Sequence, residues 1–250
     1  MAFGLGGFGD PFADALEVPP LEGVRGRLAE IKEAIARTCV RAGRDPRSVR
    51  LVGVTKLQSV AEIKEAIDAG LEDLGENYVQ EARQKAMQLP GAKWHLIGHL
   101  QKNKVHLAVQ LFQMLHTLDS ADLIQRVEQR CHERGQNLSG LIQVKLGGEP
   151  TKSGIQPGEI FRLLDQVSQS PPSRLKLVGL MAIPPQPQKP DDTRPYFRQL
   201  RSLLEQVQQR GYPFWAGAEL SMGMSLDYLV AIEEGATLVR LGTAIFGPRS

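Results

Sequence analysis

Cysteine and aromatic residues are scarce in this sequence. It contains two cysteines, and Phe, Trp and Tyr together make up 6% of its 250 residues. So low a cysteine content excludes a secreted scaffold held together by disulfides. Cys39 and Cys131 both fall in predicted helices, and we expect buried thiols in a protein of the reducing cytoplasm. The histidines are scattered and no Cys-x-x-Cys occurs, so we expect no metal site.

Long apolar runs and an excess of one charge are also missing. No apolar stretch approaches the roughly 20 residues that a membrane span needs. The N-terminal stretch lacks a basic start and contains Asp10, Asp14 and Glu17, so we expect no secretory signal. The 30 basic and 28 acidic residues leave a net charge of +2, which does not fit a nucleic-acid-binding surface. We therefore expect a cytoplasmic protein that binds neither membranes nor nucleic acids.

The chain has the length and composition of one α/β barrel domain, with 42% apolar and 23% charged residues. Strand-like and helix-like segments alternate, which predicts βαβ units and a parallel sheet. The predicted strands lie near residues 50–55, 72–75, 94–97, 114–118, 140–146, 175–182, 217–221 and 237–241. The helices between them lie near residues 59–69, 77–88, 101–108, 120–135, 157–169, 194–210 and 226–234. Eight strands favour a single (β/α)8 TIM barrel, and an open doubly wound sheet is the alternative.

The region before the first strand divides into two parts. Residues 1–20 are rich in Gly and Pro and are predicted to form a flexible tail that adds nothing to the core. Apolar residues at helical spacing from Leu21 to Cys39 predict an extra N-terminal helix. We therefore divide the chain into a tail, residues 1–20, and a barrel domain, residues 21–250.

Lys56 follows an apolar run, residues 51–54, that is typical of a buried parallel strand. The C-terminal ends of such strands carry the active sites of barrel and doubly wound folds. Burial disfavours the charged form of a lysine, and a neutral amine can form a Schiff base with an aldehyde. A lysine that only reaches solvent from a strand end is the commoner alternative.

The last two predicted strands supply a candidate phosphate site. Ser221 ends one of them, and the other leads through Arg240 into Gly242 and Thr243. Glycine lets a ligand approach the backbone, and the hydroxyl and N–H groups that follow suit a phosphate. In (β/α)8 barrels, phosphate commonly binds at the loops after strands seven and eight. Together with Lys56, this pattern predicts a ligand that carries an aldehyde and a phosphate.

Several stretches in this order resemble the YggS/PROSC family of pyridoxal 5′-phosphate (PLP) homeostasis proteins. They are residues 52–56 (VGVTK), 75–81 (GENYVQE), 94–104 (WHLIGHLQKNK), 152–154 (KSG), 179–181 (GLM), 220–225 (LSMGMS) and 240–247 (RLGTAIFG). The likeness covers roughly Leu21 to Gly247, and the N-terminal extension is its one departure from the family.

The resemblance implies a fold-type III PLP protein, a single barrel of the alanine racemase type with PLP held as a Schiff base on Lys56. It implies phosphate contacts from Ser221, Gly242 and Thr243, and a contact between Arg240 and the pyridine nitrogen. The other positions that it implies near the cofactor are Asn77, Met181, Met222 through its backbone, and His99, for which a structural role is the alternative.

Arg240 bears on whether such a protein is an enzyme. A guanidinium can only donate hydrogen bonds, so it leaves the pyridine nitrogen unprotonated and the ring a weak electron sink. The family's racemase relatives also use a tyrosine from a second domain, and we expect no such domain after the eighth strand. We therefore expect a monomeric carrier or regulator that catalyses nothing and exchanges PLP with apo-PLP enzymes.

Three other functions are also compatible with the sequence. A PLP-dependent amino-acid racemase would need a second acid–base group opposite Lys56. A Schiff-base aldolase would use Lys56 without PLP. A pure interaction protein would hold no cofactor.

Overall fold

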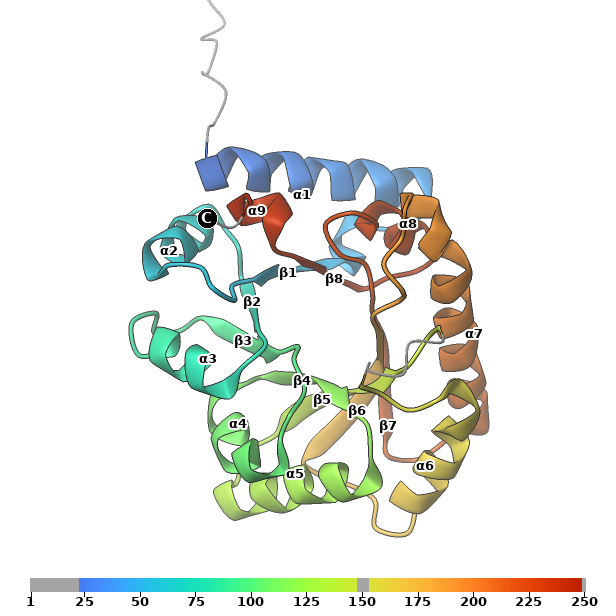
Figure 1. Cartoon of the computed structure of the whole chain (residues 1–250). Helices are drawn as coiled ribbons and strands as arrows, with labels where there is room; N and C mark the ends of the chain where they lie inside the picture. Colours follow the sequence, from blue (N-terminus) through green and yellow to red (C-terminus); the bar gives the residue numbers. More distant parts are fainter. Residues whose placement is uncertain (1–22, 148–152, 249–250) are drawn as a thin grey trace, which may run out of the picture.

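Eight parallel strands follow one another around a closed ring, and β1 pairs with β8 to complete it (Figure 1). The structure is a computed structural model and describes residues 23–147 and 153–248, so the predicted tail, residues 1–20, lies outside the described residues. The strands are β1 Arg50–Val54, β2 Asp73–Glu76, β3 Lys93–Leu96, β4 Met114–Leu118, β5 Leu138–Val144, β6 Leu175–Ala182, β7 Trp215–Ser221 and β8 Leu238–Leu241. The prediction of a (β/α)8 barrel is confirmed, because every strand pairs with two neighbours, whereas an open sheet would have two edge strands.

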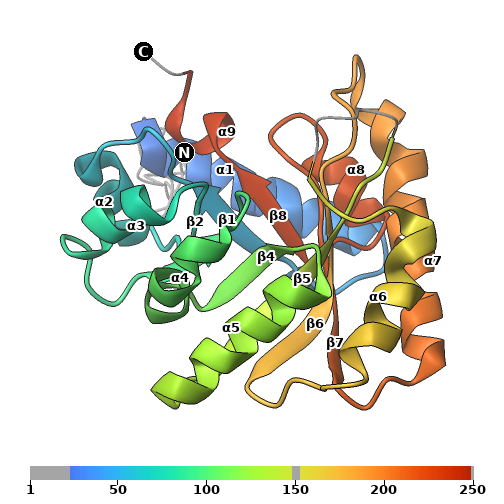
Figure 2. The same cartoon turned by 60° about the horizontal axis from the view of Figure 1, so that its bottom comes forward.

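Helices connect the strands and form an outer layer, as predicted (Figure 2). They are α2 Val60–Asp68, α3 Val79–Ala86, α4 Val105–Leu111, α5 Ala121–Arg134, α6 Ile160–Val167, α7 Arg194–Arg210 and α8 Tyr228–Glu233. α4 and α6 begin later than predicted, because the 3₁₀ turns Lys102–Lys104 and Pro157–Glu159 precede them. The short helix α9, Thr243–Phe246, follows β8.

The predicted extra helix is α1, Gly23–Arg41, which lies across α2, α8 and α9 (Figure 1). Its apolar residues face the barrel, and Cys39 among them is a buried free thiol, as is Cys131 on α5. Arg27 donates from Nε to the carbonyl of Ile245 at 2.7 Å, which ties α1 to α9. No helix in the described ranges is long and apolar enough to cross a membrane.

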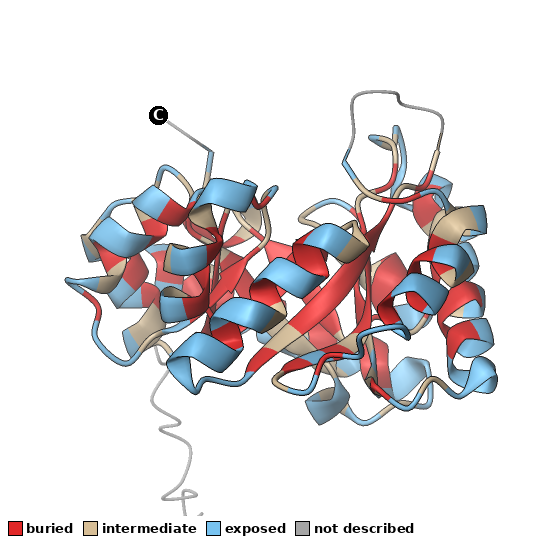
Figure 3. Ribbon diagram, turned by 90° about the horizontal axis from the view of Figure 1, so that it is seen from below, coloured by how far each residue is buried: buried red, intermediate tan, exposed pale blue. Residues whose placement is uncertain are grey.

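Two apolar clusters fill the molecule. The larger one lies between the barrel and the inner faces of the helices, which appear as buried faces under an exposed outer surface in Figure 3. The smaller one consists of Val52, Met114, Leu141, Met181 and Leu238, with one residue each from β1, β4, β5, β6 and β8. Because side chains alternate along a strand, the residues two positions further on can share the face that these five residues occupy. The residues two positions after Met114, Leu141 and Leu238 are the buried polar residues His116, Gln143 and Arg240.

Candidate functional site

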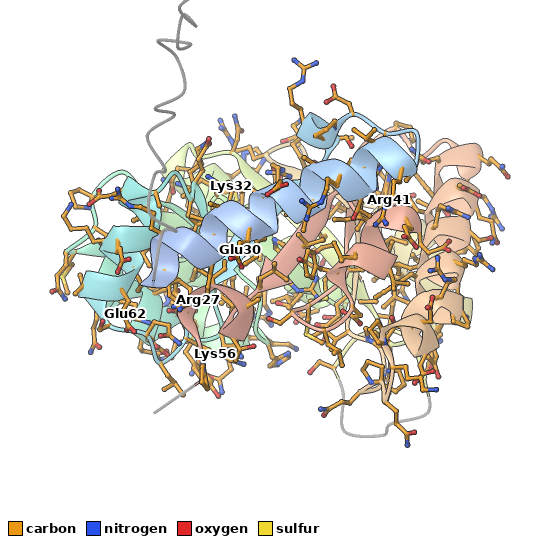
Figure 4. The ribbon with its side chains drawn as sticks, turned by 90° about the horizontal axis from the view of Figure 1, so that it is seen from above. Arg27, Glu30, Lys32, Arg41, Lys56 and Glu62 are labelled. Atoms are coloured by element: carbon orange, nitrogen blue, oxygen red, sulfur yellow. The ribbon has the colours of Figure 1, made fainter. Side chains whose placement is uncertain are left out.

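The residues predicted to form a site lie at one end of the barrel. Lys56 follows β1, Asn77 follows β2, and Gly242 and Thr243 follow β8. The closed ring brings the end of β1 beside the end of β8, since a Cβ built on Gly242 would lie 3.4 Å from Cβ of Val54. Lys56 appears at the edge of the barrel, on the same side of α1 as Arg27 (Figure 4). The end of β1, which Lys56 follows, therefore lies beside the turn after β8.

Arg240 is a buried cation without a carboxylate partner. Its side chain is 4% exposed, and in the described residues no carboxylate lies within ion-pair distance. One guanidinium nitrogen donates to Ser221 Oγ at 2.5 Å and the other to the carbonyl of Ala182 at 3.0 Å. Burial lowers the pKa of Arg240 to about 10, with Asp227 opposing the shift, so the group is still protonated at neutral pH. The site therefore contains a fixed positive charge with hydrogen-bond donors.

The turn after β8 meets the loop after β7. The Ala244 N–H in α9 donates to Ser225 Oγ at 3.3 Å, so the Ser225 hydroxyl lies beside the first turn of α9. Gly223 shapes this loop at φ +93°, where a Cβ would come within 2.6 Å of Cβ of Ala231. The first N–H groups of a helical turn have no acceptor within the helix, so this junction can accept an anion. Thr243 is exposed at the same turn.

Ser221 lies apart from that junction, inside the barrel. It is fully buried, and its hydroxyl contacts Arg240 and His116 Nδ1, the latter at 2.9 Å. The phosphate role predicted for Ser221 remains a prediction, and the contacts seen place its hydroxyl on the guanidinium. Ser225 was missed at the sequence level, although it stands in the same LSMGMS motif.

The backbone after Lys56 adopts a conformation that is unusual for its residue type. Leu57 has a φ of +62°, in the left-handed region that a leucine rarely occupies. Its N–H donates to Glu81 Oε1 at 2.8 Å, and this bond holds the turn in place. Burial favours a higher pKa for Glu81, but hydrogen bonds to Lys85 and Leu57 and the positive charges of Lys85 and Lys56 lower its pKa overall.

A buried ionic network lies next to this turn. Lys85 Nζ donates to Glu76 Oε1 and to the Thr55 carbonyl, both at 2.6 Å, and to Glu81 Oε1 at 2.8 Å. The Thr55 hydroxyl donates to Glu76 Oε1 at 2.7 Å. Burial raises the pKa of Glu76, and Lys85 and Thr55 oppose that shift. The network connects the backbone on both sides of Lys56 to β2 and α3.

Asn77 and His99 line a cavity of about 210 Å³ at the same end of the barrel, formed by residues that end or follow β2 to β6. His99 is more than half exposed, with Nδ1 3.9 Å from Asp119. Gln143 lines the cavity too, and its Oε1 is buried without a hydrogen-bond partner among the described residues. Met181 belongs instead to the small apolar cluster, and the Met222 N–H donates to the carbonyl of Leu238 at 3.1 Å.

Comparison with protein families gives one match that covers most of the chain. The model named alanine racemase, N-terminal domain, matches residues 28–250. Two similar curated proteins are both called pyridoxal phosphate homeostasis protein. That of Aquifex aeolicus is 41% identical over 225 residues, covering 89% of this chain and 97% of the relative. That of Escherichia coli K12 is 39% identical over 235 residues, covering 89% and 95%.

Solved structures agree with this match. PipY of Synechococcus elongatus, solved with PLP bound, superposes with a TM-score of 0.77 at 36% identity, covering 90% of this chain and all of PipY. Alanine racemase of Clostridium difficile superposes with a TM-score of 0.68 over 89% of this chain and 57% of the racemase. At 12% identity, the racemase is evidence for the fold alone.

Proposed function

The chain belongs to the family of pyridoxal phosphate homeostasis proteins, which carry the alanine racemase N-terminal domain, and on this premise we propose that it binds PLP. The cofactor lies at the C-terminal end of the barrel, held as a Schiff base on Lys56. The protein then keeps PLP in reserve and exchanges it with apo-PLP enzymes in vitamin B6 homeostasis. The free buried thiols of Cys39 and Cys131 suit the cytoplasm. We further propose that it acts as a monomer.

The buried guanidinium of Arg240 carries this proposal. A charged group is costly to bury without a partner, and this one has only neutral acceptors, Ser221 and Ala182, among the described residues. A pyridine nitrogen is an acceptor that such a donor suits. The strand pairing places Arg240 opposite Val52, four residues before Lys56. One end of the barrel therefore provides a donor for the ring and an amine for the aldehyde.

The turn between β8 and α9 fits the phosphate. We assign it to the backbone at Gly242, the Thr243 hydroxyl and the Ser225 hydroxyl, which lies beside the Ala244 N–H. Oriented N–H groups and hydroxyls are the usual partners of a phosphate at such a turn. Ser221 is assigned to Arg240 instead, and Asn77 and His99 to the wall of the pocket.

Arg240 also supports a function without robust catalysis. When bound, PLP supplies a reactive aldehyde and a ring that accepts electrons best when its nitrogen is protonated. A protonated arginine can only donate to that nitrogen, so it keeps the nitrogen unprotonated. Racemase activity is the second candidate, favoured by the fold of the racemase neighbour alone.

Absorption spectroscopy of the purified protein with PLP tests the proposal. We expect a visible band that disappears on borohydride reduction, after which peptide mapping finds the modification on Lys56. A protein that shows neither the band nor a modified Lys56 would not be a PLP protein of this kind.

A further inference from the structure

A chain of buried polar side chains crosses the inside of the barrel and ends on Arg240. Asp73 Oδ1 lies 3.0 Å from His95 Nε2, and His95 Nδ1 lies 3.0 Å from His116 Nε2. His116 Nδ1 lies 2.9 Å from Ser221 Oγ, which accepts from Arg240. The five residues come from five different strands, β2, β3, β4, β7 and β8. All of them are buried, His116 and Ser221 completely.

The two end residues of this hydrogen-bonded series, Arg240 and Asp73, limit the directions that its hydrogen bonds can take. Arg240 can only donate, and an ionised Asp73 can only accept. Burial opposes the ionisation of Asp73, but the hydrogen bond to His95 and the nearby charges of Arg50 and Lys93 together lower its pKa. Burial lowers the pKa of His116 well below its ordinary value, so its ring is neutral.

If both rings are neutral, one arrangement satisfies every contact. Asp73 accepts from His95 Nε2–H, so His95 Nδ1 accepts from His116 Nε2–H. His116 Nδ1 then accepts the hydroxyl hydrogen of Ser221, whose oxygen accepts from Arg240. The reverse arrangement would aim an imidazole lone pair at the Asp73 carboxylate. In this arrangement the Ser221 hydroxyl hydrogen is committed to His116 and is not available to a ligand.

Asp73, at the far end of this hydrogen-bonded series, lies at the end of the barrel opposite Lys56. Asp73 and His95 line a cavity of about 530 Å³, together with Arg50 and Arg47 near the start of β1. The series of side chains from Asp73 to Arg240 thus spans the barrel from the N-terminal ends of the strands to the candidate cofactor site. Met114, two residues before His116 on β4, belongs to the small apolar cluster, so this strand contributes both an apolar and a polar side chain to the barrel interior.

We propose that Asp73, His95, His116 and Ser221 form a positioning relay for Arg240, an inference that rests on the proposed binding of PLP. A carboxylate in place of Ser221 would also hold the guanidinium, but it would neutralise its charge. A serine oriented by two histidines holds the guanidinium by a neutral acceptor and leaves its charge to the pyridine nitrogen. His116 acts through Ser221 and Arg240 and does not contact the cofactor.

Nitrogen NMR of the apoprotein tests the relay without any cofactor. The imidazole shifts above pH 7 should show both rings as Nε2–H tautomers. An Nδ1–H tautomer at His116 would overturn the proposed direction of the relay, whether or not the protein binds PLP.

A double-mutant cycle tests the action of the relay on Arg240. His116→Phe should raise the dissociation constant of PLP about tenfold, the scale of one lost hydrogen bond at a charged group. In an Arg240→Gln background, His116→Phe should change it less than twofold. Met114→Leu on the same strand is the matched control and should leave PLP affinity unchanged. Melting temperatures of the apoproteins identify any variant that fails to fold.

The outcomes separate the two proposals. Equal effects of His116→Phe in both backgrounds would overturn the relay while leaving PLP binding intact. A wild-type protein that binds no PLP would instead refute the proposed function, and the tautomers would still decide the relay. If His116→Phe does not fold, His116→Gln serves in the same cycle, with the same two outcomes.

Discussion

Lys85 and Glu76 form a buried ion pair, with Nζ 2.6 Å from Oε1, next to the backbone that carries Lys56. The Glu76 side chain is fully buried and that of Lys85 is 9% exposed. Lys85 also binds the Thr55 carbonyl, so the pair fixes the end of β1 as well as compensating a buried charge. The contribution of this ion pair to stability can be measured by mutation.

Removing Lys85 should destabilise the fold. Lys85→Met leaves the Glu76 carboxylate buried without its partner, and we expect the free energy of unfolding to fall by about 3 kcal/mol. Urea denaturation of the apoprotein measures this loss. The double variant Lys85→Met with Glu76→Gln should recover part of it. A variant as stable as the wild type would show that the pair contributes nothing.

The loss of stability caused by Lys85→Met should depend on pH. Burial already raises the pKa of Glu76, and loss of Lys85 raises it further. A carboxyl with a raised pKa in the folded state contributes stability that is present at low pH and lost as pH rises through that pKa. The destabilisation by Lys85→Met should therefore be smaller at about pH 5 than at about pH 8. Denaturation curves with equal losses at both values would contradict this assignment.

Lys56→Ala should abolish covalent attachment of PLP without unfolding the barrel. Lys56 follows β1 and is only partly buried, so it adds little to the core. Borohydride reduction followed by mass spectrometry measures the attachment, and thermal melting measures the fold. Lys64→Ala, on the exposed face of α2, is the matched control and should bind PLP normally. An adduct at wild-type stoichiometry in the Lys56 variant would place the Schiff base on another lysine.

The phosphate assignment can be tested with two ligands. Ser225→Ala and Thr243→Val should each weaken PLP binding by about 1–3 kcal/mol, the scale of a hydrogen bond to a charged group. Pyridoxal lacks the phosphate, so its binding should be unaffected by either change. Ser221→Ala should weaken both ligands alike, because its hydroxyl lies on Arg240. Equilibrium dialysis showing a loss confined to PLP for Ser221→Ala would restore Ser221 to the phosphate.

Catalysis should be negligible. With Arg240 donating to the pyridine nitrogen, the ring draws electrons weakly from a substrate carbanion. We expect the holoprotein to exchange the α-proton of L- or D-alanine in deuterated water no faster than free PLP does. Proton NMR follows this exchange. Rapid exchange that disappears in Lys56→Ala would identify an enzyme and favour the racemase alternative.

The barrel could be predicted because its signals are local. Eight apolar segments alternate with helical patterns, and each segment shows its own structure through composition and period. Lys56, Arg240 and Gly242 could be placed at strand ends for the same reason. The prediction that the strands close into a ring is confirmed by the pairing of β1 with β8, and from that ring closure we predicted that these three residues share one site.

The direction of side chains beyond the strand ends was not predictable. Ser221 and Ser225 stand four residues apart in one motif, and either could have held a phosphate. Ser221 ends β7 and faces the interior, whereas Gly223, at a positive φ, redirects the chain so that Ser225 reaches α9. A backbone turn of this kind depends on what packs around it, here Ala231 and Tyr228.

The sequence by itself determined the fold class, the strand that precedes Lys56 and the family to which the chain belongs. Only the tertiary structure decided which groups surround Arg240. His116 and Ser221 are 105 residues apart, and nothing local relates them. They meet because alternate residues of every strand point into one closed barrel, where a buried polar group must find its partner on another strand.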